Sequence, residues 1–509
     1  MAIRKYFADK DNTITDAFEA NLTTRGTGSN MGLSDSLEVF SIYGQASNSS
    51  GYTKERSRII IKFPVTGTTS IEADRTAGAI PASGSVSFYL NLYNAVTPFT
   101  LPKQFTLNLY AIDQAWDEGN GLDMESYKDT GASNWIDRVD QTAWAITGAT
   151  FQNTASVTPW KASAYFENGT EDLSVDVTPY VESWIKGDGD GGFENYGFLV
   201  AFTPTEESAS QTYYDKKFFA RSSEYFFKRP TIEARWDNAN SDDRGAFYYS
   251  SSLATAADNM NTLYLYNYVR GQLQDIPNLG ADKYVFVSVF SGSAANDVPS
   301  GSALDLCPDN DGRVRAAALT VVTGGIVDTG IYTASFCFTG STGLTDIYDV
   351  WFTGSHVSLA TTADIQFHTG TIEPKTLDSS NINPTTEYVT KITNLKPSYT
   401  REEEPKLRVY TRKKDWSPNI YTVANSTIET DIIDKAYYKI NRTVDDLEVI
   451  SFGTGSEQQT KMSYDVSGNY FNLDMTLLET GYMYEISFAY YLNGVYKEQP
   501  QTFKFRVED

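Results

Sequence analysis

Short runs in which hydrophobic and polar residues alternate recur along the whole chain. This period of two is typical of half-buried strands, and Gly, Ser, Pro and Asn punctuate the runs as turn residues do. The clearest runs are residues 37–43, 58–63, 86–90, 105–110, 262–266, 284–290, 332–338, 482–490 and 503–507. The pattern therefore predicts a mainly β protein.

Residues 173–187 carry the one clear switch from strand to helix periodicity. Leu173 and Val175 alternate with polar neighbours, and Thr178 precedes Pro179, which suits an N-cap followed by the first helical position. Apolar residues then follow at helical spacing, and Gly187 supplies a stop. We expect a strand, a short helix capped by Thr178, and then a turn.

Residues 196–236 predict the end of the first domain. Residues 196–202 are typical of a largely buried strand, and residues 218–224 are expected to pair as a strand near the end of the domain. Hydrophobic and polar residues alternate again over residues 232–236. The polar stretch 237–245 is rich in Asp, Asn and Ser, which favours a boundary.

The fold class that follows is mainly β, with an N-terminal sandwich and two smaller immunoglobulin-like β-sandwich domains. The predicted domains are residues 1–236, 246–372 and 373–509. The size of the second domain suits an immunoglobulin-like sandwich. The sequence leaves open whether the second and third domains have that topology or are sandwiches of similar size.

Composition narrows the function classes. The 509 residues carry a formal net charge of −24, which argues against a protein that neutralises nucleic-acid phosphates. The aromatic share of 14% goes with strands. We find neither an apolar run of membrane-spanning length nor a signal-peptide core, so no membrane insertion and no conventional export are expected.

The two cysteines do not form a disulfide framework in a chain of this length. Cys337 lies in an alternating run between Phe336 and Phe338, which predicts a small buried strand residue. A bridge to Cys307 is the alternative.

One loop resembles a calcium site. Asp188 and Asp190 alternate with glycines, so their oxygens can turn toward one hard cation. The loop lacks the downstream acid of a complete calcium loop, and an exposed turn after the helix explains its glycines equally well. Calcium is therefore the one cofactor considered, with Asp188 and Asp190 as its ligands.

Aromatic residues supply a second candidate site. Trp116, Trp135 and Trp144 lie near Asp113, Asp117 and Glu118, a combination that suits a sugar-binding rim with stacking rings and hydrogen-bonding carboxylates. The alternative is that the three indoles are buried in a core.

Catalytic chemistry finds no support in the sequence. His356 and His368 lie near no nucleophile motif and no zinc spacing, and no glycine-rich phosphate loop opens a helix. We therefore expect no catalytic residues and no enzyme.

A basic segment stands out against the acidic background. Arg408, Arg412, Lys413 and Lys414 flank apolar residues and follow three glutamates at 402–404. These mixed signs suit docking to an acidic protein neighbour better than binding to nucleic acid. The alternative is a solvated edge strand protected by lysines.

The first 236 residues resemble the DNRLRE-type domain. The resemblance rests on segments in order: Asp176-Val177-Thr178, Val181, Trp184 with Gly187, Asn195-Tyr196-Gly197-Phe198, residues 218–224 and Arg229-Pro230. It implies a jelly-roll-like sandwich related to carbohydrate-binding modules, found on bacterial surfaces and virions. The closing motif is longer here than in the family, where Ser-Arg-Glu stands in place of Ala220-Arg221-Ser222-Ser223-Glu224.

Residues 8–15, 25–32, 37–39 and 397–405 are similar to segments of virion proteins from tailed phages of marine bacteria. This resemblance implies a protein made in the host cytoplasm and incorporated into the virion. Its expected partners are other virion proteins and further copies of itself in a symmetric assembly, with host-surface glycan as an additional contact.

The function expected is thus a non-enzymatic structural protein at the neck or collar, head or tail surface of a phage. A secreted or cell-surface carbohydrate-binding adhesin is the alternative, which the missing export signal disfavours. A polysaccharide depolymerase is disfavoured by the absence of a catalytic constellation.

Overall fold

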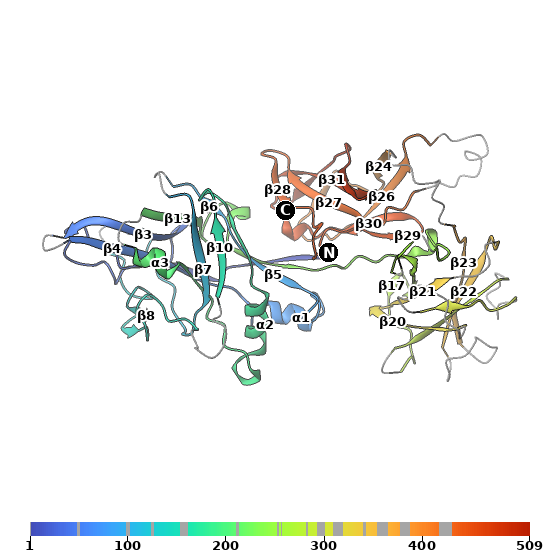
Figure 1. Ribbon diagram of the computed structural model, residues 1–509, viewed down its shortest axis with the longest axis horizontal. Helices are drawn as coiled ribbons and strands as arrows, with labels where there is room; N and C mark the ends of the chain where they lie inside the picture. Colours follow the sequence, from blue (N-terminus) through green and yellow to red (C-terminus); the bar gives the residue numbers. More distant parts are fainter. Residues whose placement is uncertain are drawn as a thin grey trace. The chain divides into compact units, whose positions relative to one another are not determined.

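The computed structural model describes residues 2–47, 51–97, 102–123, 127–152, 161–209, 213–251, 254–255, 257–280, 283–292, 301–308, 319–338, 343–353, 365–376, 387–416 and 430–509. Strands dominate, and nearly all pair antiparallel (Figure 1). The predicted mainly β class is confirmed.

The chain divides into two compact units. Unit 1 contains residues 1–237, 453–459 and 476–479, and unit 2 contains residues 238–452, 460–475 and 480–509. The division at 237/238 falls in the predicted polar break. Unit 2 includes both of the predicted later domains.

Unit 1 contains two large antiparallel sheets. The four-stranded sheet has the order β1 (Ile3–Phe7), β14 (Thr231–Arg235), β5 (Ser87–Leu92), β11 (Leu173–Asp176). The eight-stranded sheet has the order β10 (Lys161–Phe166), β7 (Phe105–Ala111), β12 (Phe198–Phe202), β4 (Gly51–Lys62), β3 (Ser36–Ser47), β13 (Tyr213–Phe219), β6 (Asn94–Ala95), with β2 (Lys10–Thr15) also paired to β4. A small ribbon joins β8 (Asp137–Val139) to β9 (Thr142–Ala143).

The two large sheets share one apolar core. Phe88 and Ile232 of the four-stranded sheet lie in the same buried cluster as Ile61, Leu109 and Val200 of the eight-stranded sheet. The core of unit 1 therefore draws its side chains from two antiparallel sheets.

Helices lie at the margin of these sheets. They are α1 (Ile71–Thr76), α2 (Thr178–Lys186) and α3 (Pro204–Ser208), with 3₁₀ turns η2 (Asp188–Asp190) and η3 (Phe226–Lys228). Figure 1 shows α1 beside α2, and Arg75 of α1 donates to both carboxylate oxygens of Glu182 at 2.6 and 2.9 Å.

The predicted helix after residue 177 is confirmed, but its predicted cap is wrong. Val177 occupies the N-cap position, and the hydroxyl of Thr178 instead accepts a hydrogen bond from the backbone of Phe88 in β5 at 2.8 Å. Trp184 is buried as expected, and Gly187 ends the helix with φ 68°, a conformation that favours glycine.

Unit 2 contains three sheets of four or more strands. The seven-stranded sheet has the order β15 (Asn261–Tyr266), β21 (Ile331–Phe338), β20 (Val322–Asp328), β18 (Val285–Phe290), β22 (Ile347–Thr353), β23 (Ile365–Ile372), and β19 (Leu306–Cys307) pairs with β21. The four-stranded sheet has the order β24 (Tyr388–Ile392), β26 (Lys406–Lys413), β30 (Gly468–Asn472), β29 (Ser463–Asp465). The six-stranded sheet has the order β25 (Ser398–Thr400), β33 (Phe503–Glu508), β31 (Met483–Leu492), β27 (Ala436–Arg442), β28 (Leu447–Ile450), with β32 (Val495–Glu498) paired to β31.

The remaining elements of unit 2 are short. Among the described residues they are the ribbon of β16 (Tyr268–Val269) and β17 (Gln272–Leu273), and the 3₁₀ turns η4 (Asp243–Gly245) and η5 (Ala257–Asn259). The 3₁₀ turn η7 (Met475–Leu477) crosses the division between the two units. Apart from this ribbon, the strands of residues 261–372 share one sheet, and strands from residue 388 onward form the other two.

Candidate functional site

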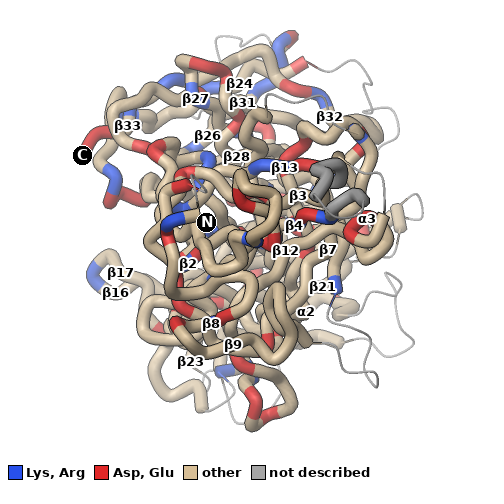
Figure 2. The backbone as a smooth tube through the Cα atoms, turned by 90° about the vertical axis from the view of Figure 1, so that its left-hand side faces the viewer, with Lys and Arg blue, Asp and Glu red and all other residues tan. Residues whose placement is uncertain are grey.

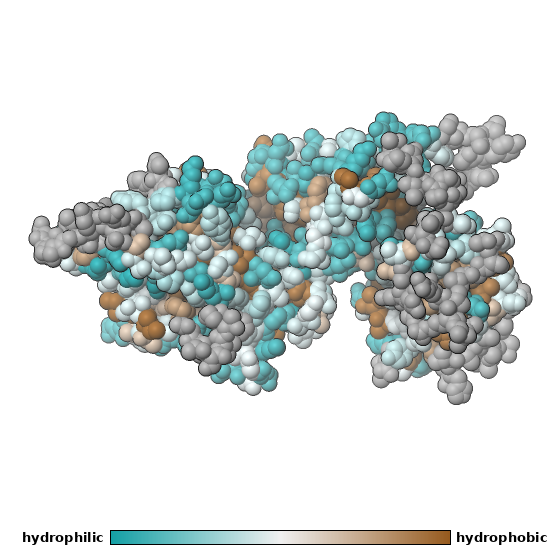
Figure 3. Space-filling model, in the orientation of Figure 1, coloured by the Kyte–Doolittle hydropathy of each residue, from teal (hydrophilic) through white to brown (hydrophobic). Residues whose placement is uncertain are grey.

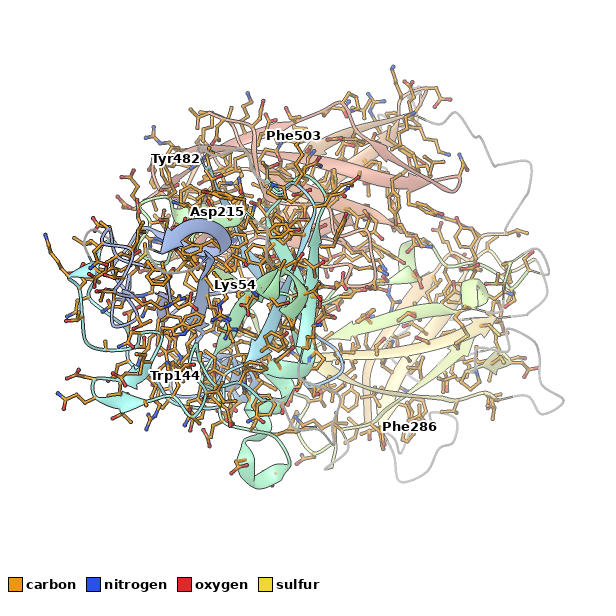
Figure 4. The ribbon with its side chains drawn as sticks, turned by 60° about the vertical axis from the view of Figure 1, so that its left-hand side comes forward. Lys54, Trp144, Asp215, Phe286, Tyr482 and Phe503 are labelled. Atoms are coloured by element: carbon orange, nitrogen blue, oxygen red, sulfur yellow. The ribbon has the colours of Figure 1, made fainter. Side chains whose placement is uncertain are left out.

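The three tryptophans of the predicted sugar-binding rim lie in a buried cluster. Trp116, Trp135 and Trp144 are 4%, 6% and 4% exposed. They pack with Ile60 and Leu199, whose side chains point away from the main core, on the outer face of the eight-stranded sheet. The loop between β7 and β10 thus covers this face with a second core, and Figure 4 labels Trp144 beside the short strands of the loop.

The polar edges and faces of these indoles are already occupied. Trp116 Nε1 donates to the carbonyl of Tyr196 at 2.8 Å, and Trp144 Nε1 donates to the carbonyl of Asn134 at 2.9 Å. The guanidinium groups of Arg56 and Arg58 each lie 5.1 Å from the ring centre of Trp135. The prediction of a stacking rim is therefore wrong, because a pyranose requires an exposed aromatic face.

The predicted calcium ligands, Asp188 and Asp190, lie in the 3₁₀ turn η2 directly after Gly187, and both are exposed. In the parts of the chain that the structure describes, no group of three or more His, Cys, Asp or Glu side chains could hold a metal ion. The two aspartates therefore lack the converging oxygens that calcium needs.

The closing turn after β13 is held by a buried ion-pair network. Arg221 donates from Nε and Nη2 to the two carboxylate oxygens of Glu118 at 2.7 and 2.5 Å. Its backbone N–H donates to Asp11 at 2.7 Å, and the backbone N–H of Asp11 donates to Glu118 at 2.9 Å. Burial raises the pKa of Asp11 to about 7. These hydrogen bonds hold the turn against β2, which contains Asp11, and against the β7–β10 loop, which contains Glu118.

A fully buried lysine fastens the edge of the same sheet. Lys216 of β13 is 1% exposed, and its ammonium donates to Asn94 Oδ1 at 2.6 Å and to the carbonyls of Glu171 and Gly169 at 2.8 and 3.1 Å. Burial lowers its pKa to about 8. Its acceptors come from β6 and from the segment before β11, so one side chain ties three segments together.

In unit 2 the linker after residue 237 is not free. The backbone of Asn240 and Asp242 exchanges hydrogen bonds with Tyr464 at 3.0 and 3.1 Å, which forms a parallel bridge to β29. Asp243 accepts from the hydroxyl of Tyr464 at 2.7 Å and from the backbone of Thr262 in β15 at 2.6 Å. The linker thus bonds to the seven-stranded sheet and to the four-stranded sheet at once.

The next residue of the linker enters the core of the seven-stranded sheet. Arg244 donates to both oxygens of Asp349 at 2.5 and 2.7 Å, and Trp351 Nε1 donates to the same carboxylate at 2.7 Å. Burial alone would raise the pKa of the fully buried Asp349, but hydrogen bonds and charge from Arg244 outweigh it and hold this pKa below its usual value. A Cβ on Gly370 would lie 2.2 Å from Arg244 Nη1, so glycine leaves the space for the guanidinium.

We call residues 239–246 and their partners Tyr464, Thr262 and Asp349 the linker junction. Two of its carboxyl groups are strongly affected by their surroundings, since burial raises the pKa of Asp242 and Asp243 to about 6. Sequence reasoning missed this junction, because it read the run of polar residues as a solvated break. The one sequence feature that could have indicated the junction is its high content of acidic and amide residues, and a solvated linker has the same composition.

The predicted basic docking segment lies on β26, which pairs with β24 on one side and β30 on the other. Residues 406–409 of β26 pair with β30 and residues 409–413 pair with β24, so in the described pairings Arg412 and Lys413 lie next to β24 alone, as the edge-strand alternative expects. Arg408 is used inside the unit, because it forms an ion pair with Asp465 at 2.7 Å and its guanidinium lies 4.8 Å from the ring centre of Tyr470.

The other basic residues of the segment differ in exposure. Arg412 is half-buried with its guanidinium 5.7 Å from the ring centre of Trp416, whereas Lys413 and Lys414 are exposed. Lys414 pairs with Glu387 at 2.6 Å, and both side chains face solvent. Among the four predicted contact residues, Lys413 and Lys414 thus lie on the surface.

The remaining candidates are placed as follows. His368 lies on β23 opposite Trp351 of β22, and burial lowers its pKa. His356 lies outside the described residues. Cys337 is a buried strand residue, as predicted, and neither cysteine is part of a disulfide. No helix among the described residues is both long and apolar enough to cross a membrane.

Figures 2 and 3 each show one view of the described residues. Acidic residues occur along most of the elements visible in Figure 2, and the apolar residues visible in Figure 3 form scattered spots. No protein-family model matches the chain, and a comparison with curated proteins finds no relative.

Proposed function

We propose that this chain is a non-enzymatic structural protein of a tailed-phage virion, mounted at the neck or collar, the head or the tail surface. It acts in a symmetric assembly of its own copies together with other virion proteins. The sequence segments at 8–15, 25–32 and 397–405 motivate the proposal, and the linker junction is the structural observation that supports it most.

The linker junction suits an architectural protein because the linker residues are themselves bonded to the sheets of unit 2. A free linker has few bonds to the structure around it, whereas residues 239–246 form backbone hydrogen bonds to one sheet of unit 2 and an ion pair with another sheet of the same unit. Tyr464 and Asp349 lie on two different sheets, and successive residues of the linker, Asp243 and Arg244, bind them. A protein that transmits force or sets the position of other subunits in a particle needs segments that are bonded to their neighbours in this way.

The finer fold assignment belongs to the same proposal. We assign unit 1 to a DNRLRE-type jelly-roll-like sandwich domain, and residues 246–372 and 373–509 to immunoglobulin-like sandwiches. The two antiparallel sheets of unit 1 and their common core support the first assignment. The short antiparallel strands of the two later segments support the second.

A non-enzymatic role agrees with how the perturbed groups are used. Asp11, Lys216 and Asp243 have shifted pKa values, and such groups often mark active sites. Here each one hydrogen-bonds to a neighbouring strand or loop of the same chain. Their shifts therefore have a structural cause.

Contact with host polysaccharide is no longer part of the proposal, because Trp116, Trp135 and Trp144 are buried. The carbohydrate-binding adhesin is not retained for the same reason.

The proposal is tested on particles purified from a lysate of the phage that encodes the chain. We expect quantitative mass spectrometry to find the chain at a fixed ratio to the major capsid protein, retained after a high-salt wash. Particles from a phage with the gene deleted should lack one symmetric feature in electron-microscopy averages. Recovery only with bacterial envelopes would contradict the proposal, and release of reducing sugar from host capsule would show an enzyme instead.

A further inference from the structure

The two cysteines of the chain occupy directly opposite positions on neighbouring strands. β19 pairs antiparallel with β21, and in this register Cys307 faces Cys337. Neither is part of a disulfide in this structure, and both are buried, at 4% and 0% exposed. The sequence holds no other cysteine, so within one chain neither thiol has a competing partner.

The spacing of an antiparallel pair suits a disulfide without movement of the backbone. Directly opposite residues have Cα atoms about 4.5–5.5 Å apart. A disulfide accepts Cα separations of about 4.4–6.8 Å. Adjacent strands and a fixed register therefore meet the main geometric requirement.

The side chains also lie on the same side of the sheet. Opposite residues of an antiparallel pair point to one face. The preceding pair in the register, Leu306 and Phe338, belongs to the apolar core of the seven-stranded sheet. Because side chains alternate along a strand, Cys307 and Cys337 both point to the other face.

Other roles for a cysteine pair lack support in the surroundings. No metal-binding group that includes either thiol occurs among the residues described. A catalytic thiol is partly exposed in an electropositive setting, whereas both of these are buried. The pairing itself is the feature that needs an explanation.

We propose that Cys307 and Cys337 form an intramolecular disulfide when the protein passes from a reducing to an oxidising environment. Each thiol loses a proton and the pair loses two electrons, which reduce an external small-molecule disulfide to two thiols through a mixed-disulfide step. Within the chain one S–S bond forms as two S–H bonds break, and in the oxidant one S–S bond breaks as two S–H bonds form. The pairing rests on the register alone, and only its timing, at release of particles by lysis, rests on the proposed function.

The cross-link would fix β19, a strand of two residues, to the much longer β21. A disulfide stabilises chiefly by restricting the unfolded chain. The oxidised protein should therefore melt at a higher temperature than the reduced protein.

The test uses the full chain, purified with reductant and then refolded from urea in buffers that step the ratio of oxidised to reduced glutathione. Free thiols are alkylated in denaturant and counted by intact mass. We expect two alkyl groups on the reduced chain and none on the oxidised chain, with a linked pair of peptides that contains residues 307 and 337. Native incubation with the same buffers checks that refolding has not created the bond.

Two results would overturn the proposal. One is that both thiols remain alkylatable at every glutathione ratio, and the other is that oxidation yields only dimers through bonds between chains. Cys307→Ser and Cys337→Ser are the matched controls, and the melting temperature of each should not respond to oxidant. Absence of the chain from purified particles would remove the proposed function but would leave these measurements unchanged.

Discussion

A buried carboxylate such as Asp349 is stable only because Arg244 and Trp351 bind it. Replacing Arg244 with Met leaves this charge without a cation in a site that is 0% exposed. We expect Arg244→Met to lower the free energy of unfolding by about 3–5 kcal/mol, the usual cost of breaking a buried pair from one side. Urea unfolding followed by tryptophan fluorescence measures it, because Trp351 reports the site.

Two variants calibrate this result. Arg244→Met combined with Asp349→Asn should recover much of the loss, because the second change removes the unpaired charge and keeps an acceptor for Trp351. Lys414→Met breaks a pair whose side chains are 66% and 54% exposed, so it should leave the stability nearly unchanged. A small effect of Arg244→Met alone would mean that the pair contributes little.

Lys216 leads to a second prediction about a single side chain. Lys216→Met fills similar space but leaves the oxygens of Asn94, Gly169 and Glu171 without their donor. We expect a loss of about 2–4 kcal/mol in the free energy of unfolding, since unsatisfied buried acceptors are costly. Lys217→Met is the matched control on the opposite face of the same strand. Equal effects of the two changes would contradict the role assigned to Lys216.

Sequence periodicity predicts which residues are buried better than it predicts what they bind. The alternation placed Leu173 and Cys337 inside, and both are buried. It could not place Trp116 in a core, because an isolated aromatic in a loop has no periodic neighbours. The side-chain partners of Asp11 and Lys216 lie 45 or more residues away in the chain, so no local pattern contains them.

At the level of elements, the β7–β10 loop is predicted to act as part of the core. Trp116→Ala should lower the free energy of unfolding by about 3–5 kcal/mol, because it empties a large packed volume. Leu122→Ala, at a position 66% exposed in the same loop, should have little effect. Differential scanning calorimetry distinguishes the two, and an unchanged melting temperature for Trp116→Ala would restore the rim hypothesis.

The linker junction predicts resistance of the linker to proteolysis. A protease that cleaves before aspartate should cut readily at the exposed Asp237 but slowly at Asp242, whose backbone is bonded to Tyr464, and at Asp243, whose carboxylate accepts from Tyr464 and Thr262. Tyr464→Ala removes the bond to Asp243 and should raise cleavage at 242 and 243 by about tenfold, as a loss near 1.4 kcal/mol would. Tyr482→Ala, at an exposed position, is the control. Equal cleavage of the three sites in the unmodified chain would contradict the junction.

The sequence predicts strands well and their neighbours poorly. The runs at 262–266, 284–290 and 503–507 became β15, β18 and β33. β26 has the lysines and arginines of an edge strand, but its residues 406–409 pair with β30 and its residues 409–413 pair with β24. Whether a strand is central depends on which distant segments pair with it, and the composition of the strand does not indicate which segments these are.

The whole molecule should become more stable on mild acidification. Burial raises the pKa of Asp11 to about 7 and that of Asp242 and Asp243 to about 6, and it raises the pKa of Asp215 as well. The folded chain therefore binds more protons than the unfolded chain in this range, and stability falls as pH rises. The net charge of −24 also favours stability at lower pH, because protonation of carboxylates reduces the repulsion between negative charges in the folded chain.

Lys216, whose pKa burial lowers to about 8, opposes this gain in stability only near pH 8 and above. Two other opposing groups act at lower pH. The pKa of His368 is lowered, so its protonation favours unfolding as the pH falls below its ordinary value of 6.5. The pKa of Asp349 is lowered, so its contribution is lost only under stronger acid. We expect the melting temperature to rise from about pH 8 to about pH 6 and then to fall in stronger acid. Asp11→Asn should reduce the rise, and a steady fall from pH 8 downward would refute the prediction.

The second core on the eight-stranded sheet has a consequence for natural variation. Strands β4 and β12 bury side chains on both faces, through Ile61 and Val200 on one side and Ile60 and Leu199 on the other. A related chain that shortened the β7–β10 loop would expose these residues to water and invite aggregation. Insertions and deletions among relatives should therefore avoid this loop, and the residue types at positions 60 and 199 should vary together with those at 116 and 144.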